Sequence, residues 1–310
     1  MTALIPGVCS ALTQAVVDSL KKIGVKTVTD FITDDVESLA QRCTIPYKDL
    51  VAIKRVLLAQ HSAYPILGHE AYSSACSSLA FFSTGCESLD LILDGGLYTG
   101  EVTEVAGEIA AGKTQICLSS AACVSCQQRV VYVDTCGAFS AERVMEMLQL
   151  QSYTQNPEEV MSRIRCFQPH DIFTLFSVLE DVRVQLVKQT DSFYSGLKLL
   201  VVDSVTSVIY PVLGGQQMDG HGLMVQLGHT LKMLAVEFSI AVLVSNNVVF
   251  GADGQRVASL GRTWSHVPHT RLIIEKTGRS EHRRAVVVKS SRLVTPVSAL
   301  FTIPSLEPDS

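Results

Sequence analysis

Charged residues are scarce in this sequence, and an excess of positive charge is missing. Lys, Arg, Asp and Glu together make up 18% of the 310 residues, and the formal net charge is −5. A dedicated nucleic-acid-binding protein is usually basic overall. Any contact with nucleic acid must therefore come from local patches of this chain or from its partners.

Long uncharged apolar runs and regularly spaced cysteines are also lacking. No such run reaches the roughly 18 residues of a membrane-spanning helix, and Pro6 and Gly7 interrupt the first apolar stretch. The nine cysteines include one C-x-x-C pair, Cys123 and Cys126, which has no second pair at the spacing of a zinc site. We therefore expect a soluble protein of the cytosol or nucleus, with no membrane partner and with free, mostly buried thiols.

The first 60 residues have the pattern of a small helical domain. Apolar residues at helical spacing predict helices over residues 13–23, 34–43 and 46–59. Asp34 is the expected N-cap of the second helix. Short helices joined by tight turns suggest a helix-hairpin-helix module, which often contacts DNA phosphates through helix N-termini. A bundle that docks onto protein, or that is merely structural, is the alternative. Residues 61–82 contain proline, glycine and a run of serines and form the predicted linker.

From residue 83 to residue 310 the pattern becomes that of an α/β domain. Runs rich in Val, Leu and Ile alternate with helical segments, as in residues 101–106, 130–134 and 197–203. Apolar runs between helices are typical of strands buried on both faces of a sheet. After residue 267 the strands have little helix between them. We therefore expect a mainly parallel central sheet flanked by helices, with antiparallel strands at its C-terminal edge.

A phosphate-binding loop is the strongest chemical signal in the sequence. Its motif, G-x-x-x-x-G-K-[ST], is matched by Gly107, Glu108, Ile109, Ala110, Ala111, Gly112, Lys113 and Thr114. A strand precedes the loop and a helix follows it, so that backbone N–H groups can surround a β-phosphate at a helix N-terminus. Lys113 is expected to contact the phosphates and Thr114 to bind Mg²⁺. The predicted cofactors are therefore ATP and Mg²⁺.

Two apolar runs end in an acid that could serve this metal. Residues 199–203 end in Asp203, as in a Walker B strand, and residues 130–134 end in Asp134 in the same way. An acid at the tip of such a strand lies near the Mg²⁺ of a P-loop protein. The pattern leaves both acids open, and one of them is expected to serve the metal.

An ordered set of motifs extends far beyond these two sites. It comprises Ser83-Thr84-Gly85, Leu89-Asp90, Gly95-Gly96-Leu97, Thr99 to Glu104, Gln115 after the loop, Tyr132 to Thr135, Phe139 to Arg143, Val202 to Val205, Val244 to Val248 and Thr270-Arg271-Leu272. This set resembles the RecA-like recombinases of eukaryotes and archaea over most of the chain. Residues 214–217, 261–265 and 289–292 look most like the D paralogue group of the eukaryotic strand-exchange recombinase.

The resemblance implies a RecA-like P-loop ATPase core and roles for individual residues. Gln115 joins the nucleotide-binding residues, and Asp203 matches the Walker B acid that serves Mg²⁺. Arg143 matches an arginine that stacks on adenine, with a solvated helix charge as the alternative. Asn247 matches a polar residue that senses the γ-phosphate, with an amide that caps the strand end as the alternative.

One departure from active members of the family concerns catalysis. Those members carry Asp-Thr-Glu-Gly where this chain carries Asp134-Thr135-Cys136-Gly137, and their Glu orients the attacking water. Cys136 has no carboxylate, and the loss of a positioned base typically costs about 10²–10⁴ in rate. We therefore expect ATP binding with weak DNA-dependent ATPase activity, unless a neighbouring subunit completes the site.

The segments that match the DNA-channel loops, residues 210–222 and 248–263, depart as well. The first contains no Lys or Arg, and the second contains only Arg256 and Arg262. Because phosphate neutralisation drives DNA affinity, these two arginines predict a weak DNA contact by the chain alone.

A short segment of the linker predicts contact with other subunits. Tyr72-Ser73-Ser74-Ala75 resembles the aromatic-x-x-Ala segment by which recombinases dock onto a neighbour, with Tyr in place of the usual Phe. Docking would add a strand to the neighbour's sheet. Tyr72 and Ala75 are the predicted partner-binding residues.

Together these features predict an ATP-binding subunit of a hetero-oligomeric complex of recombinase paralogues in the nucleus. It would bind single-stranded or branched DNA and promote homologous recombination repair. A filament-forming strand-exchange recombinase and a RecA-fold helicase-type motor are the alternatives. Cys136 and the sparse DNA loops favour the paralogue over the recombinase, and the N-terminal helical domain disfavours the motor.

Overall fold

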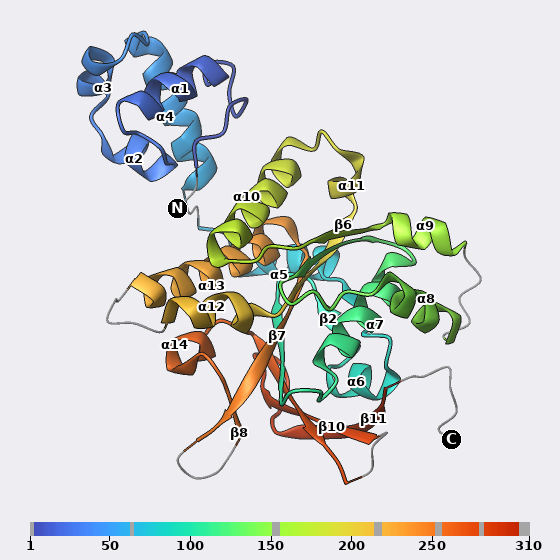
Figure 1. Cartoon of the computed structure of the whole chain (residues 1–310). Helices are drawn as coiled ribbons and strands as arrows, with labels where there is room; N and C mark the ends of the chain where they lie inside the picture. Colours follow the sequence, from blue (N-terminus) through green and yellow to red (C-terminus); the bar gives the residue numbers. More distant parts are fainter. Residues whose placement is uncertain are drawn as a thin grey trace. The chain divides into compact units, whose positions relative to one another are not determined.

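The structure is a computed structural model that describes residues 3–62, 65–150, 156–213, 219–251, 256–278 and 282–303 (Figure 1). The chain divides into two compact units, Met1–Ser74 and Ala75–Ser310. Over the ranges just given, no helix is long and apolar enough to cross a membrane.

The N-terminal unit packs short helices around its own apolar core. They are α1 (Gln14–Lys22), α2 (Val28–Thr33), α3 (Val36–Arg42) and α4 (Tyr47–His61). Leu20, Phe31 and Leu50 are fully buried in the core. The three helices expected from the sequence are confirmed, but the position of one cap was wrong. Asp35, and not Asp34, caps α3 by accepting a hydrogen bond from the backbone N–H of Ser38 at 2.9 Å.

Helix α2 was not predicted, because its six residues are too short for an apolar period to show. It is fixed by a reciprocal cap, in which Thr27 and Asp30 each accept a backbone N–H of the other residue. Helix α5 (Gly68–Ser78) lies within the segment predicted as a linker, and none of its residues is buried.

The C-terminal unit is built on one large sheet. Its strands are β3 (Val102–Gly107), β4 (Arg129–Asp134), β5 (Ile164–Phe167), β6 (Leu197–Asp203), β7 (Ala241–Phe250), β8 (Arg256–Ala258), β9 (Thr270–Lys276), β10 (His282–Lys289) and β11 (Val297–Thr302). The order is β11-β10-β9-β3-β7-β6-β4-β5, with β8 paired to β7. Strands β1 (Phe81–Phe82) and β2 (Leu97–Tyr98) form a separate antiparallel pair.

The strand directions confirm the predicted mixed sheet. β9, β3, β7, β6, β4 and β5 run parallel to one another, whereas β10 and β11 are antiparallel at the C-terminal edge. One detail differs from the expectation that antiparallel strands begin after residue 267. β9 still belongs to the parallel part, because it follows α14 and pairs with β3.

Helices cover both faces of the sheet (Figure 1). One face packs against α6 (Glu87–Ile92), α7 (Lys113–Ser125), α8 (Ala141–Leu150) and α9 (Pro157–Ser162). The other packs against α10 (Ile172–Lys188), α11 (Ser192–Ser195), α12 (Val205–Leu213), α13 (Asp219–Phe238) and α14 (Gly261–Ser265). Val130 and Tyr132 belong to the first core and Val131 and Val133 to the second. Burial on both faces explains the unbroken apolar runs of the sequence.

The same topology brings the sequence motifs together. β3, β7, β6 and β4 are neighbours in the sheet and point in one direction. Their carboxyl ends, and the segments that follow them, therefore meet at one edge of the sheet, which is where ligands bind in open α/β folds.

Candidate nucleotide-binding site

The phosphate-binding loop links β3 to α7, as its motif requires. Gly107 and Gly112 could not carry a side chain without displacing neighbours. A Cβ on Gly107 would lie 2.9 Å from the carbonyl oxygen of Ile274, and one on Gly112 would lie 2.6 Å from Cδ1 of Ile303. Gly112 also has a φ of +104°, which favours glycine. The loop backbone therefore packs closely against Ile274 in β9 and against Ile303.

Lys113 lies against the first two residues of this loop. Its ammonium donates hydrogen bonds to the backbone oxygens of Gly107 and Glu108, both at 2.9 Å. Burial lowers the pKa of Lys113, and the negative charge of Asp203 partly opposes this shift. The positive charge of Lys113 is thus held beside the loop, and it interacts electrostatically with Asp203.

Asp203 is buried at the tip of β6 and is held by two donors. The hydroxyl of Tyr132 donates to Oδ2 at 3.0 Å, and the hydroxyl of Ser245 donates to Oδ1. Asp134 is engaged differently, because it accepts the backbone N–H groups of Cys136, Ala138 and Phe139 at 3.0–3.1 Å. Of the two acids that the sequence left open, Asp203 is therefore the better candidate to serve a metal.

Cys136 lies where β4 and β6 end side by side. Its side chain is exposed, and Sγ is 3.6 Å from Oγ of Ser204 and 3.7 Å from Oγ1 of Thr135. Thr135 in turn accepts the backbone N–H of Ser204 at 2.7 Å. The position is thus surrounded by hydroxyl groups, and neither a thiol nor a hydroxyl supplies the carboxylate base of active relatives.

The cysteines differ from the expectation of mostly buried thiols. All nine are free, but only Cys117 and Cys126 are buried, and Cys76, Cys136 and Cys166 are exposed. The expectation was wrong because a cysteine at the end of a strand or on a solvent-facing helix follows the exposure of its backbone position and not that of its residue type.

Arg143 is held beside the first turn of α7. Its Nε donates to Oε1 of Gln115 at 2.8 Å, and its Nη1 donates to Oε2 of Glu146 at 2.7 Å. The side chain is only 19% exposed, so it is not a freely solvated helix charge. Stacking of this guanidinium on adenine stays a prediction.

Asn247 lies directly beside the phosphate-binding loop. It is the register partner of Gly107 in the parallel pairing of β7 with β3. Its backbone N–H donates to Oδ1 of Asn246 at 2.8 Å and to Oγ1 of Thr206 at 3.2 Å. This position is compatible with the predicted sensing of a γ-phosphate by Asn247.

A buried polar network behind the loop was missed by the sequence reasoning. Glu104 in β3 is fully buried and accepts hydrogen bonds from Nε1 of Trp264 at 2.8 Å and Nδ2 of Asn246 at 2.6 Å, and it also pairs with Arg271. Asn246 also accepts the hydroxyl of Ser259. The network connects the strand before the phosphate loop to the segment after β8. Its signal in the sequence was an acid inside an otherwise apolar strand.

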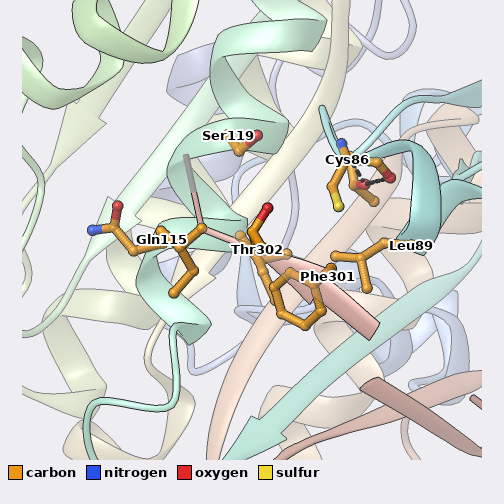
Figure 2. A pocket seen from close by; sticks show the side chains of 9 residues that line it. Cys86, Leu89, Gln115, Ser119, Phe301 and Thr302 are labelled. Carbon is orange, nitrogen blue, oxygen red and sulfur yellow. Dashed lines mark hydrogen bonds between the residues drawn. The ribbon is translucent and has the colours of Figure 1, made fainter. Parts of the chain in front are cut away.

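A small hollow adjoins the start of α7 (Figure 2). It encloses about 260 Å³, including space open to solvent, and its labelled lining residues are Cys86, Leu89, Gln115, Ser119, Phe301 and Thr302. The hydroxyl of Ser119 is buried and has no hydrogen-bond partner among the described atoms. Gln115 connects the hollow to Arg143. Its mainly apolar lining does not suit a phosphate group.

The two arginines predicted to bind DNA lie on different elements. Arg256 at the start of β8 forms ion pairs with Glu108 and Glu275, and Arg262 is exposed on α14. Within the predicted DNA segments, residues 214–218 and 252–255 lie outside the described residues.

The residues predicted to bind a partner lie on α5. Tyr72 and Ala75 are both exposed, and the Tyr72 side chain is 73% exposed. The predicted docking by an added strand needs an extended segment, whereas the structure shows a helix here. The predicted linker thus contains a helix, and docking as an added strand would require this segment to become extended. Gly68–Ser78 contains no proline, and Glu70, Ala71 and Ala75 are its good helix formers.

Comparison with known proteins assigns the chain to a family. A family model described as Rad51 matches residues 76–305, which include the loop, Asp203 and Asn247. The chain belongs to the Rad51 family. A second model, described as "RAD51D, N-terminal domain", matches residues 1–60. These matches confirm the predicted fold class and the resemblance to the D paralogue group.

Named relatives of this Rad51-family chain share nearly its full length. "DNA repair protein RAD51 homolog 4" of Bos taurus is 44% identical over 99% of this chain and 96% of its own length. The protein of the same name in Mus musculus is 41% identical over the same shares. "DNA repair and recombination protein RadA" of Metallosphaera sedula is 28% identical over 92% of this chain and 89% of its own length.

A nucleotide, typically with Mg²⁺, is the ligand that this family implies, and the residues present fit it. The loop has glycine at the two positions where a Cβ would clash with neighbouring residues, and Gly112 has a positive φ. Lys113 supplies a half-buried positive charge at the loop. Thr114 in the first turn of α7 and the buried Asp203 supply the oxygen donors that Mg²⁺ prefers.

Proposed function

We propose that this Rad51-family chain is the ATP-binding subunit of a complex of recombinase paralogues that promotes homologous recombination repair of DNA in the nucleus. One observation carries the proposal. Lys113 lies against the phosphate-binding loop and Asp203 is buried at the tip of β6, whereas Cys136 stands at the position predicted for a water-orienting acid. Membership of the Rad51 family and relatives named as DNA repair proteins support the cellular role.

The loop residues would bind the triphosphate and hold it without cleaving it quickly. Backbone N–H groups from Gly107 to Thr114 would donate to phosphate oxygens, and Lys113 would neutralise their charge. Bound Mg²⁺ would supply further charge neutralisation, with Thr114 and Asp203 as its protein partners. Cys136 offers no carboxylate to accept a proton from an attacking water. The nucleotide would therefore act mainly as a stabiliser of subunit contacts, with weak DNA-dependent turnover.

The proposal includes single-stranded or branched DNA and sister paralogues as binding partners. Arg256 and Arg262 are the cations of the second predicted DNA segment, and so small a number supports weak binding by the chain alone. Tyr72 and Ala75 are exposed on α5 and available to another subunit.

Co-purification and ATP turnover test this function together. Tagged wild-type chain and the Lys113→Ala variant are co-expressed with candidate paralogues and purified with and without Mg-ATP. We expect nucleotide to strengthen recovery of the partners with wild type and not with the variant. Lys113→Arg, which keeps the charge, is the matched control and should lose less. Rapid, DNA-stimulated hydrolysis by the purified chain alone would instead favour a strand-exchange recombinase.

A further inference from the structure

The hydroxyl of Ser204 lies beside the side chain that stands at the position predicted for a water-orienting acid. Ser204 directly follows Asp203 at the end of β6, and its Oγ is 3.6 Å from Sγ of Cys136, just after the end of β4. The pairing of Asp134 with Asp203 sets these two strand ends side by side. A polar oxygen is therefore present next to the place from which a longer acidic side chain would reach an attacking water.

The backbone of Ser204 is held on both sides. Its N–H donates to Oγ1 of Thr135 at 2.7 Å, and its carbonyl oxygen accepts the hydroxyls of Thr135 and Ser207, both at 2.8 Å. The whole residue is only 7% exposed. Because these hydrogen bonds fix the backbone, the hydroxyl occupies a defined place at the tip of the strand. A group that positions a reacting molecule needs such a fixed support.

The hydroxyl itself keeps a lone pair available. In the part of the chain that the structure describes, it has two hydrogen-bonding neighbours, the backbone N–H of Ser207 at 3.4 Å and Sγ of Cys136. A hydroxyl oxygen has two lone pairs, and 3.4 Å is long for an N–H···O bond. When the hydroxyl hydrogen points to the sulfur, Oγ can therefore accept a hydrogen bond from a water molecule.

We propose that Ser204 orients the attacking water in place of the missing acid and is responsible for the weak ATP turnover of this chain. This inference rests on the proposed nucleotide-binding function. A hydroxyl is too weak a base to remove a proton. Positioning of the nucleophile nevertheless forms a large part of phosphoryl-transfer catalysis, and a neutral side chain can supply it. With one hydrogen of the water held by Oγ, a lone pair of the water is left to face the γ-phosphorus.

The reaction of this water is hydrolysis of the terminal phosphate. The water oxygen bonds to the γ-phosphorus while the bond from that phosphorus to the β–γ bridging oxygen breaks, and ADP leaves with the bonding electron pair. One proton of the water stays on its oxygen. The other passes to a second oxygen of the phosphate, which leaves as H₂PO₄⁻, because no carboxylate is present at Cys136 to accept it. Ser204 is unchanged and contributes orientation alone.

Binding of a transition-state analogue tests this orientation without depending on turnover. Mg-ADP with aluminium fluoride mimics a planar phosphate in line with a water molecule, whereas a non-hydrolysable Mg-ATP analogue mimics the ground state. We expect Ser204→Ala to weaken binding of the aluminium fluoride complex by about three- to tenfold, the effect of one neutral hydrogen bond. Its affinity for the Mg-ATP analogue should stay that of wild type, and phosphate release should fall by the same factor as analogue binding.

Three further substitutions separate orientation from a structural effect. Ser204→Thr keeps the hydroxyl and should retain most of the binding of the aluminium fluoride complex. Ser204→Cys has nearly the same size but a weak acceptor, so it should lose as much as Ser204→Ala. Ser207→Ala is the matched control, because its hydroxyl bonds within the same cluster while Thr135 still holds Ser204. We expect this control to bind both ligands like wild type.

A second comparison uses the Cys136→Glu background. A carboxylate at that position would orient the water itself, so Ser204→Ala should cost much less there than in the wild-type background. Substitutions that act on one shared interaction are not additive. An equal cost of Ser204→Ala in the two backgrounds would contradict the assignment of Ser204 to the water.

The outcomes separate this inference from the proposed function. If Ser204→Ala and Ser204→Cys bind the aluminium fluoride complex as tightly as wild type, the inference is refuted and nucleotide binding stands. Equal weakening of the aluminium fluoride complex and the Mg-ATP analogue also refutes it, because Ser204 would then serve the phosphates or the metal and not the water. If the wild-type chain binds neither ligand, alone or in complex with paralogues, the inference and the proposed function fail together.

Discussion

Tyr132 donates a hydrogen bond to Asp203 at 3.0 Å, although 71 positions separate the two residues in the sequence. The parallel pairing of β4 with β6 brings them together. Burial and the neighbouring negative charges raise the pKa of Tyr132 well above its usual value, so its hydroxyl stays protonated and can donate. The acid that we propose to serve Mg²⁺ is thus oriented from the adjacent strand.

Replacing Tyr132 with Phe tests this orientation. Tyr132→Phe keeps the ring but leaves the buried carboxylate of Asp203 with one donor fewer. We expect the free energy of unfolding to fall by about 1–3 kcal/mol and the Mg²⁺ concentration needed for nucleotide binding to rise. Urea unfolding followed by the fluorescence of Trp264, the only tryptophan, measures the first effect. Tyr98→Phe, whose hydroxyl bonds the backbone oxygen of Asp94, is the control and should leave the Mg²⁺ dependence unchanged.

Replacing Cys136 with Glu should restore a positioned base. The residue is exposed where β4 and β6 end, so a longer side chain has room. We expect DNA-stimulated phosphate release to increase about 10²–10⁴-fold, the range that a general base typically contributes. Cys136→Gln has nearly the same size without the charge and should stay slow. Equal rates for the two variants, with nucleotide binding intact, would show that the missing acid is not what limits turnover.

Because His269 is held in its neutral form, we expect the folded protein to lose stability in mild acid. Its Nδ1 accepts the backbone N–H of Val102 at 2.9 Å, which requires a neutral ring. Burial lowers the pKa of His269 below its ordinary value of 6.5. Below pH 6.5 the unfolded chain therefore takes up a proton that the folded chain refuses. The free energy of unfolding should fall as the pH decreases from 7 through 6 and level off once the folded pKa is passed.

Unfolding of the C-terminal unit, monitored by Trp264 fluorescence at several pH values, measures this dependence. His269→Asn keeps an acceptor near the position of Nδ1 but cannot titrate. Its unfolding free energy should vary less between pH 7 and pH 5.5 than that of wild type. The same slope in both proteins would assign the effect to other groups.

Charged substitutions at exposed residues of α5 test the predicted subunit contact. Tyr72→Glu and Ala75→Glu place charges where docking onto a neighbour would bury apolar groups, and we expect either variant to lose most of the partner recovered in co-purification. Ser73→Glu adds the same charge to the same helix and is the control. Partner binding that survives both substitutions would exclude this segment as the contact.

The features that sequence alone predicted are those with a local physical cause. Apolar runs specify strands such as β4 and β6, because burial on both faces favours apolar residues at most of their positions. The phosphate-binding loop is a continuous motif whose glycines, Lys113 and flanking elements follow one another directly. The general form of the sheet followed from these elements and their order.

The features that sequence did not predict depend on residues far apart in the chain. Glu104 meets Trp264 only because α14 packs beside β3, and Arg256 meets Glu108 only because β8 folds back on β7. No spacing rule encodes such contacts. The cap of α3 is a similar case. Asp34 is the C-cap of α2, so the N-cap of α3 is Asp35 and not the predicted Asp34.

Calorimetric titration of Mg-ATP into the purified chain tests the central claim most directly, with the assembled paralogue complex measured in parallel. We predict saturable binding of one nucleotide per chain that is lost in Lys113→Ala, together with little ATP consumed over the titration. Absence of binding to the wild-type chain in both preparations, or equal binding by Lys113→Ala, would contradict the account of this loop as a nucleotide site.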